Sequence, residues 1–186
     1  MSRYRYCGCE CSAAGLSRRA LVAGLACAAI LPAAAVARAP DAASDQDVRF
    51  MRMALEEARH GDFPFGAVIV RDGSVIARGR NLDRVSGDPT DHAEMVAIRR
   101  CLAAHGSAAL RGSTLYTSGE SCAMCMGAII WCGLGRVVFA ASIAQLATKI
   151  DQIMITDAEI AAKAAFAPVA ITGGVLADEA MALFAK

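Results

Sequence analysis

The sequence carries almost no net charge and has few histidines. Its 19 Lys and Arg residues nearly balance 18 Asp and Glu residues, so the formal net charge is only +1 at pH 7. The chain as a whole therefore gives no sign of the basic surface that binds nucleic-acid phosphates, and we expect nucleic acid not to be its partner. Only three His residues are present, which limits the imidazole ligands that a metal site can use.

The sequence also lacks a long, strongly apolar run. The most apolar stretch, residues 20–37, is rich in Ala and contains Gly24 and Pro32. It falls short of the roughly 20 strongly apolar residues that cross a bilayer, so we expect no stable membrane span. Beyond Pro40 there is no internal repeat or low-complexity segment. With 186 residues and 56% hydrophobic composition, the chain suits one domain plus an appendage.

The appendage is the first 39 residues, which hold five Arg and one Glu and leave 14 basic and 17 acidic residues for the remainder. Arg18-Arg19, an Ala/Leu/Val stretch and small residues at 35–39 form the n-region, h-region and cleavage pattern of a secretory signal. The segment 17–21, SRRAL, resembles the bacterial twin-arginine export signal. A membrane anchor or a lipoprotein signal ending at Cys27 fits these residues less well.

We therefore predict that residues 1–39 are a cleaved signal peptide of twin-arginine type and that residues 40–186 are the working domain. The mature protein is then periplasmic, or the protein is cytoplasmic if the leader is not functional. Four of the eight cysteines lie in the leader, and Cys101, Cys122, Cys125 and Cys132 lie in the domain.

Hydrophobic periodicity in the domain predicts helices that alternate with strands. Helices are expected from Asp45 to Gly61, over 92–106, over about 122–131 and over 178–186. Strands are expected over 65–70 and 74–80 as a hairpin with an Asp72-Gly73 turn, then over 113–117, 136–141 and 169–172. This alternation predicts an α/β fold with helices on both faces of one sheet.

The stretch 117–131, TSGESCAMCMGAIIW, places Cys122 and Cys125 three residues apart. A redox disulfide and two small buried residues are both open readings of this pair. A metal site is the third, because His92 lies 30 residues upstream and completes a set of three N and S ligands. A catalytic zinc takes three protein ligands and leaves the fourth position for water.

Helix geometry favours the metal reading. Residues three apart share one helical face, and the free N–H groups of a first turn favour thiolates. Ser118 or Ser121 could cap this helix. Cys132 lies about 10 Å further along the axis, too far for the same ion. Cys101 lies on the face of its helix opposite His92, so we assign it and Cys132 to the core.

Glu94 lies two residues after His92 and cannot share its direction along a regular helix. It is therefore a poor metal ligand, but it can reach a water on the open fourth position. A water whose pKa is lowered by zinc needs a carboxylate to accept its proton and pass it on. The sequence thus predicts a metal site of His92, Cys122 and Cys125 with Glu94 as the catalytic residue.

The motifs HAE (residues 92–94) and ESCAMC (residues 120–125) resemble the His-x-Glu and Pro-Cys-x-x-Cys signature of the zinc-dependent cytidine and deoxycytidylate deaminase superfamily. The resemblance runs from about Val48 to Phe184, with Ser121 in place of the usual Pro. It implies a three-layer α/β/α sandwich around a mixed sheet of about five strands, one Zn2+ per chain and a homodimer. GDFPFGAVIV, DPTDHAEMVAIR and ITGGVLADEA are similar to the branch of guanine deaminase and tRNA adenosine deaminase.

The resemblance also implies substrate contacts. Asn81 matches a substrate-contacting Asn of the branch, although it is also a common turn residue. Asp151 aligns with an acidic substrate contact of guanine deaminase across an alignment gap, and an ordinary surface Asp is the alternative interpretation. The backbone around Ala93 and Gly119 is expected to shape the pocket. Phe63 or Phe65 is available to stack on a base.

These observations favour a hydrolytic deaminase of a free nucleobase or nucleoside, with guanine as the best single substrate. The alternative is a tRNA-specific adenosine deaminase, but the chain ends MALFAK with one Lys, and an exported protein would not meet tRNA. A second alternative is a structural zinc module without catalysis. Such sites close all four positions with Cys or His, and His60 and His105 have no motif around them.

Overall fold

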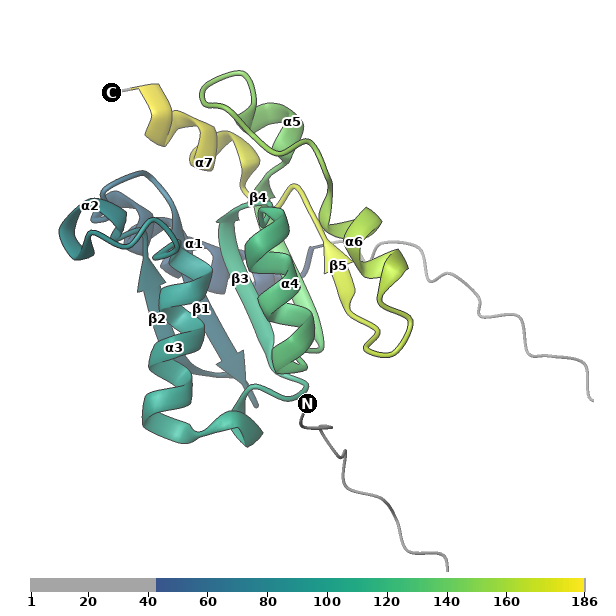
Figure 1. Cartoon of the computed structure of the whole chain (residues 1–186). Helices are drawn as coiled ribbons and strands as arrows, with labels where there is room; N and C mark the ends of the chain where they lie inside the picture. The colour runs from purple at the N-terminus through teal and green to yellow at the C-terminus, as the bar shows by residue number, and fades with distance from the viewer. Residues whose placement is uncertain (1–42, 186) are drawn as a thin grey trace, which may run out of the picture. The chain divides into compact units, whose positions relative to one another are not determined.

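The computed structural model describes residues 43–185; the predicted signal peptide, residues 1–39, lies outside the described residues. The elements in order (Figure 1) are α1 (Asp45–Arg59), β1 (Gly66–Arg71), β2 (Ser74–Arg80), α2 (Asp83–Ser86), α3 (Ala93–His105), η1 (Ser107–Ala109), β3 (Thr114–Gly119), α4 (Ala123–Cys132), β4 (Arg136–Ala141), α5 (Ile143–Leu146), α6 (Asp157–Lys163), β5 (Ala170–Thr172), α7 (Ala177–Ala182) and η2 (Leu183–Ala185). The long elements lie where periodicity predicted them. The short helices α2, α5 and α6 were not predicted. Within the described range, no helix has the length and apolar character that a membrane crossing requires.

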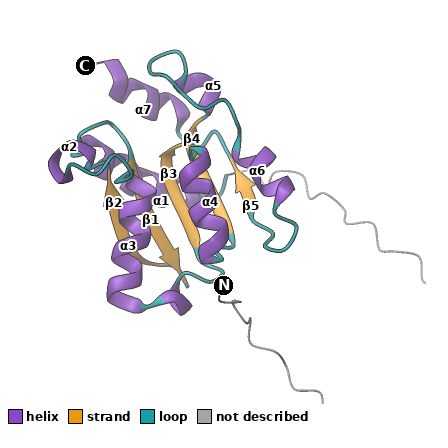
Figure 2. Cartoon of the chain, in the orientation of Figure 1, coloured by secondary structure: helices purple, strands orange, loops and turns teal. Residues whose placement is uncertain are grey.

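The five strands form one mixed sheet in the order β2-β1-β3-β4-β5 (Figure 2). β1 pairs antiparallel with both β2 and β3, whereas β4 pairs parallel with β3 and β5. Asp72 and Gly73 both have positive φ, 50° and 73°, in the turn between β1 and β2. Two successive positive φ values match the twist of a tight hairpin, so the predicted Asp-Gly turn is present.

Helices cover both faces of the sheet, with α3 and α4 on one face and α1 on the other (Figure 1). Successive residues of β1 show why. Ala67 and Ile69 pack into the core beneath α3 and α4, while Val68 and Val70 pack into the core beneath α1 and α7. Because side chains alternate across a strand, a fully apolar strand must be covered on both sides. The predicted three-layer α/β/α sandwich with a mixed five-stranded sheet is confirmed.

A buried carboxylate joins α1 to the sheet. Asp47 caps the start of α1 with Ser44 and also accepts hydrogen bonds from the Tyr116 hydroxyl at 2.9 Å and from Arg136 Nη1 at 2.7 Å. Burial alone would raise its pKa, but the Arg136 hydrogen bond and the others outweigh burial and lower it to about 2. Asp47 therefore stays charged and ties α1 to β3 and β4.

The start of α3 lies close to β2 because position 79 of β2 is a glycine and has no side chain. A Cβ at Gly79 would lie 2.2 Å from the Ala93 carbonyl oxygen and 2.5 Å from the Ala97 nitrogen. Only glycine lets the helix backbone approach the strand this closely. The contact fixes the first turn of α3, and with it His92, against the end of the sheet.

Candidate metal centre and substrate pocket

Three ligand side chains converge from the starts of two helices. His92 is the N-cap residue of α3, Cys122 is the N-cap residue of α4, and Cys125 lies in the first turn of α4. His92 Nδ1 lies 3.6 Å from Cys122 Sγ and 3.7 Å from Cys125 Sγ. The expected cap from Ser118 or Ser121 is absent, because Cys122 itself occupies the N-cap position without a side-chain capping bond.

These separations fit zinc. A tetrahedral Zn2+ with Zn–N of about 2.05 Å and Zn–S of about 2.3 Å places its N and S ligands about 3.6 Å apart. The three ligand atoms all lie within 4.8 Å of one another, and no other group of His, Cys, Asp or Glu in residues 43–185 forms a comparable set. His92 faces the sulfurs through Nδ1, which the sequence could not specify.

The remaining cysteines and histidines of the domain lie elsewhere. Cys101 is fully buried in the core beneath α3 and α4, and Cys132 packs against the same core. His60 pairs with Glu56 at 3.2 Å, and His105 Nε2 lies 3.1 Å from the Ile76 carbonyl oxygen. Among residues 43–185, the group of possible ligands therefore contains three residues and no fourth.

The three ligand side chains shift one another's pKa values. A hydrogen bond with the Cys125 thiol, together with His92 and against the effect of burial, lowers the pKa of Cys122 to about 4. The same pairing and burial raise the pKa of Cys125, and the hydrogen bond to Cys122 raises the pKa of His92. Cys122 is therefore the more acidic of the two thiols, and a bound dication would favour release of both thiol protons.

Glu94 lies beside this set without joining it. It is the second residue of α3, its side chain is only 6% exposed, and it lines the pocket together with His92 and Cys122. Burial raises its pKa above the usual range of a glutamate. A carboxyl with a raised pKa holds its proton more readily, which suits a group that both accepts and donates a proton.

The pocket over the ligands has a volume of about 470 Å³, within the usual range for small-molecule sites. The predicted contacts Phe65, Asn81 and Asp151 line it, and so does Phe63; Ala93 and Gly119 do not. The residues that sequence reasoning missed are Asp83, Pro89, Glu120, Met124, Ile150, Gln152 and Ile153. Most of them lie on short helices or connections, where no periodicity marks them.

Asn81 is both a turn residue and a pocket residue. It is 3% exposed, its backbone N–H donates to the Phe65 carbonyl at 3.0 Å, and its Oδ1 accepts from the Asp83 N–H at 3.4 Å. Gly119 acts on the pocket through Phe65. A Cβ at Gly119 would lie 3.0 Å from Phe65 Cε1, so glycine makes room for that ring.

Comparison with known proteins places this geometry in a family. The family model for the cytidine and deoxycytidylate deaminase zinc-binding region matches residues 44–141, just over half of the chain. The chain belongs to this family. His92, Cys122, Cys125 and Glu94 all lie within the matched range, and the resemblance seen in the sequence is confirmed, as is zinc as the metal.

Curated relatives come from both expected branches. The chain is 51% identical over 78 residues to guanine deaminase of Bacillus subtilis, a match that covers 42% of this chain and 50% of that protein. It is 40% identical over 100 residues to the tRNA-specific adenosine deaminase of the same organism, covering 52% and 62%. The matches thus span about half to three-fifths of these relatives.

Solved structures give the same pair of branches. A guanine deaminase from Nitrosomonas europaea superposes with a TM-score of 0.63 at 27% identity, over 77% of this chain and 84% of that chain. A tRNA:A34 deaminase superposes with a TM-score of 0.63 at 30% identity, over 73% and 98%. The fold is therefore shared with enzymes that act on a free base and with enzymes that act on RNA.

Proposed function

We propose that this protein is a zinc-dependent hydrolytic deaminase of a free nucleobase or nucleoside, with guanine as the preferred substrate. The observation that carries the proposal is the buried Glu94 carboxyl beside three zinc ligands in a pocket of about 470 Å³. Three ligands leave one position for water, and Glu94 supplies the proton carrier that hydrolysis needs.

The residues divide the work between chemistry and binding. His92, Cys122 and Cys125 would hold the zinc ion, which would supply a Lewis acid to activate the water that attacks the amino-bearing ring carbon. Glu94 would accept one proton of that water and deliver it to a ring nitrogen; it would then carry the second proton of the same water from the attacking oxygen to the amino group, which leaves as ammonia. The Phe65 ring offers a stacking surface, and the Asn81 amide offers a donor and an acceptor to the edge of the base.

The charge of the pocket supports a free base over RNA. Its lining residues include the carboxylates of Asp83, Glu94, Glu120 and Asp151 and no Lys or Arg. Such a surface repels phosphates, which tRNA recognition must neutralise. The alternative, a tRNA-specific adenosine deaminase, is supported by the tRNA:A34 deaminase structure, which is as similar in fold to this chain as the guanine deaminase structure is.

The substrate is identified by measuring ammonia release from a panel of compounds: guanine, guanosine, adenosine, cytosine, cytidine and a tRNA anticodon loop. We expect release from guanine, and kcat/KM should change less than about twofold between low and moderate salt. Binding of an RNA loop would weaken steeply over the same range, because it releases counterions. Conversion of adenosine to inosine in the anticodon, with no release from free purines, would establish the tRNA reading instead.

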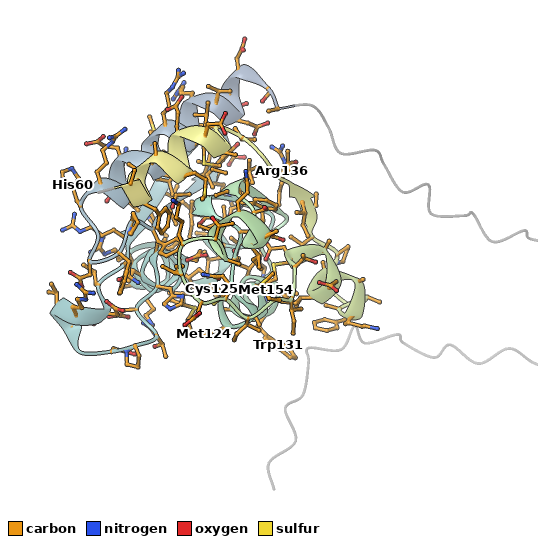
Figure 3. The ribbon with its side chains drawn as sticks, turned by 90° about the horizontal axis from the view of Figure 1, so that it is seen from above. His60, Met124, Cys125, Trp131, Arg136 and Met154 are labelled. Atoms are coloured by element: carbon orange, nitrogen blue, oxygen red, sulfur yellow. The ribbon has the colours of Figure 1, made fainter. Side chains whose placement is uncertain are left out.

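We also propose that the protein is a homodimer, with an exposed apolar patch as part of the interface. Met124, Trp131, Met154 and Phe166 are 36%, 71%, 61% and 66% exposed, and the Trp131 and Phe166 rings lie 5.3 Å apart. Figure 3 shows Met124 and Trp131 at the edge of the domain away from α1 and α7. Exposed aromatic clusters of this kind are typical of interfaces.

Trp131→Glu tests the patch. Sedimentation velocity should give a dimer for the wild type and a monomer for this variant, because a buried unpaired charge disfavours association. Val85→Glu, at an exposed position on α2, is the control and should remain dimeric. A Trp131→Glu protein that sediments as the wild type does would remove this patch from the interface.

We further propose export by the twin-arginine route, which carries folded proteins and would let Cys122 and Cys125 bind zinc before they meet an oxidising compartment. Changing Arg18 and Arg19 together to Lys should leave an active, zinc-loaded precursor in the cytoplasm. Cell fractionation with a zinc assay measures this. Normal periplasmic amounts of the double variant would show that the arginine pair does not direct export.

A further inference from the structure

Glu120 joins the metal loop to two short helices. It lies two residues before Cys122, and the residue is 8% exposed. Its Oε2 accepts a hydrogen bond from the Ile143 N–H at 2.9 Å, and its Oε1 accepts one from the Asp157 N–H at 3.0 Å. Ile143 and Asp157 are the first residues of α5 and α6. The N–H group of a first helical residue has no acceptor within its own helix.

The connection between these helices forms one wall of the pocket. Residues 147–156 join α5 to α6, and Ile150, Asp151, Gln152 and Ile153 within them line the pocket over the zinc ligands. The helices α5 and α6 flank this connection (Figure 2). One buried carboxylate thus bonds to the starts of both. The Glu120 N–H also donates to the Ala141 carbonyl at 2.7 Å, so the carboxylate projects from a backbone fixed to β4.

The helices have other caps, but those caps are local. Thr156 and Glu159 form a capping box at the start of α6, and Ser142 and Gln145 form one at the start of α5. Each box bonds residues of the same helix start and does not reach the metal loop. Removing a box weakens a helix end, whereas removing Glu120 releases the wall from the zinc ligands.

We propose that Glu120 is a positioning residue that fixes residues 150–153 at a set distance from Cys122, and so holds the base over the metal. The inference rests on the proposed function for its substrate. Its chemistry requires a carboxylate: Gln retains one acceptor oxygen but turns an NH2 donor toward the second N–H. Charge-assisted bonds to both N–H groups are the stronger form, and only Glu makes both.

Glu120→Gln tests this in the zinc-loaded full chain. Hydrogen–deuterium exchange of residues 147–156 should accelerate about tenfold or more. The KM for guanine should rise about tenfold, with a smaller fall in kcat and one zinc per chain retained. Glu159→Gln is the matched control: it alters the local cap of α6 and should leave the exchange of 147–153 and the KM unchanged.

A second pair of variants removes the donor instead of the acceptor. Asp157→Pro deletes the N–H that reaches Glu120, and Pro suits a first helical position after the extended Thr156, which has φ −75° and ψ 157°. Asp157→Asn keeps the N–H. We expect faster hydrogen–deuterium exchange over residues 147–156 in Asp157→Pro than in Asp157→Asn. If Glu120→Gln does not fold, this pair of variants still tests whether the hydrogen bond to Glu120 holds the wall in place.

Wild-type exchange rates over 147–156 in both Glu120→Gln and Asp157→Pro would overturn the proposal. So would a KM increase that Glu159→Gln reproduces. Failure of the wild-type protein to deaminate guanine would count against the proposed substrate alone, because the exchange measurement needs no substrate.

Discussion

Glu94→Ala is expected to bind one zinc ion per chain and to lose turnover by a factor of about 10² to 10⁴, the usual contribution of a general acid–base group. The metal should remain because His92, Cys122 and Cys125 form the ligand set and Glu94 does not join it. Turnover should fall because Glu94 is the one pocket carboxyl in the first turn of α3, directly after His92, and no other pocket carboxyl can take its place as proton carrier. Zinc content by elemental analysis and ammonia release measure the two effects.

Glu94→Gln is the matched control for packing. It keeps the volume of a side chain that is only 6% exposed and removes the ability to carry a proton. It should therefore retain zinc and a wild-type Tm and lose turnover as Glu94→Ala does. Zinc loss from both variants would make Glu94 a ligand, and turnover within about tenfold of the wild type would remove it from the chemistry.

Cys122→Ala or Cys125→Ala should reduce bound zinc to nearly none and lower the free energy of unfolding. Both effects follow because metal-binding free energy is in part folding free energy. Cys132→Ala should keep its zinc and lose only the packing of a half-buried side chain. Equal zinc loss from Cys132→Ala would overturn the ligand assignment. Thermal unfolding with and without a chelator separates the two contributions.

Hydrophobic periodicity was enough to predict the long helices and strands from the sequence. The Asp72-Gly73 turn and the starts of α3 and α4 at His92 and Cys122 follow from local signals that act over a few residues. The short helices α5 and α6, of 4 and 7 residues, are too short to show a hydrophobic period. Their capping boxes, Ser142 with Gln145 and Thr156 with Glu159, are nevertheless visible in the sequence as S-x-x-Q and T-x-x-E.

The convergence of His92, Cys122 and Cys125 could be predicted from the sequence and the pocket wall could not, for a physical reason. Three ligands and Glu94 occur in two short motifs whose spacing reflects helix geometry. The wall over residues 150–153 depends instead on where α5 and α6 pack, which Glu120 determines through backbone groups far along the chain. Backbone donors leave no pattern in the side-chain sequence. The one sequence signal for this arrangement was the position of Glu120, two residues before Cys122.

X-ray absorption at the zinc edge tests the central claim most directly, because it counts ligands without a substrate. For the purified chain we predict two sulfur ligands at about 2.3 Å, one nitrogen at about 2.0–2.1 Å and one further light atom from water. That shell has the open position that hydrolysis requires. A closed shell with a third sulfur, or with a second imidazole from His60 or His105, would contradict the account and make the site a structural zinc module.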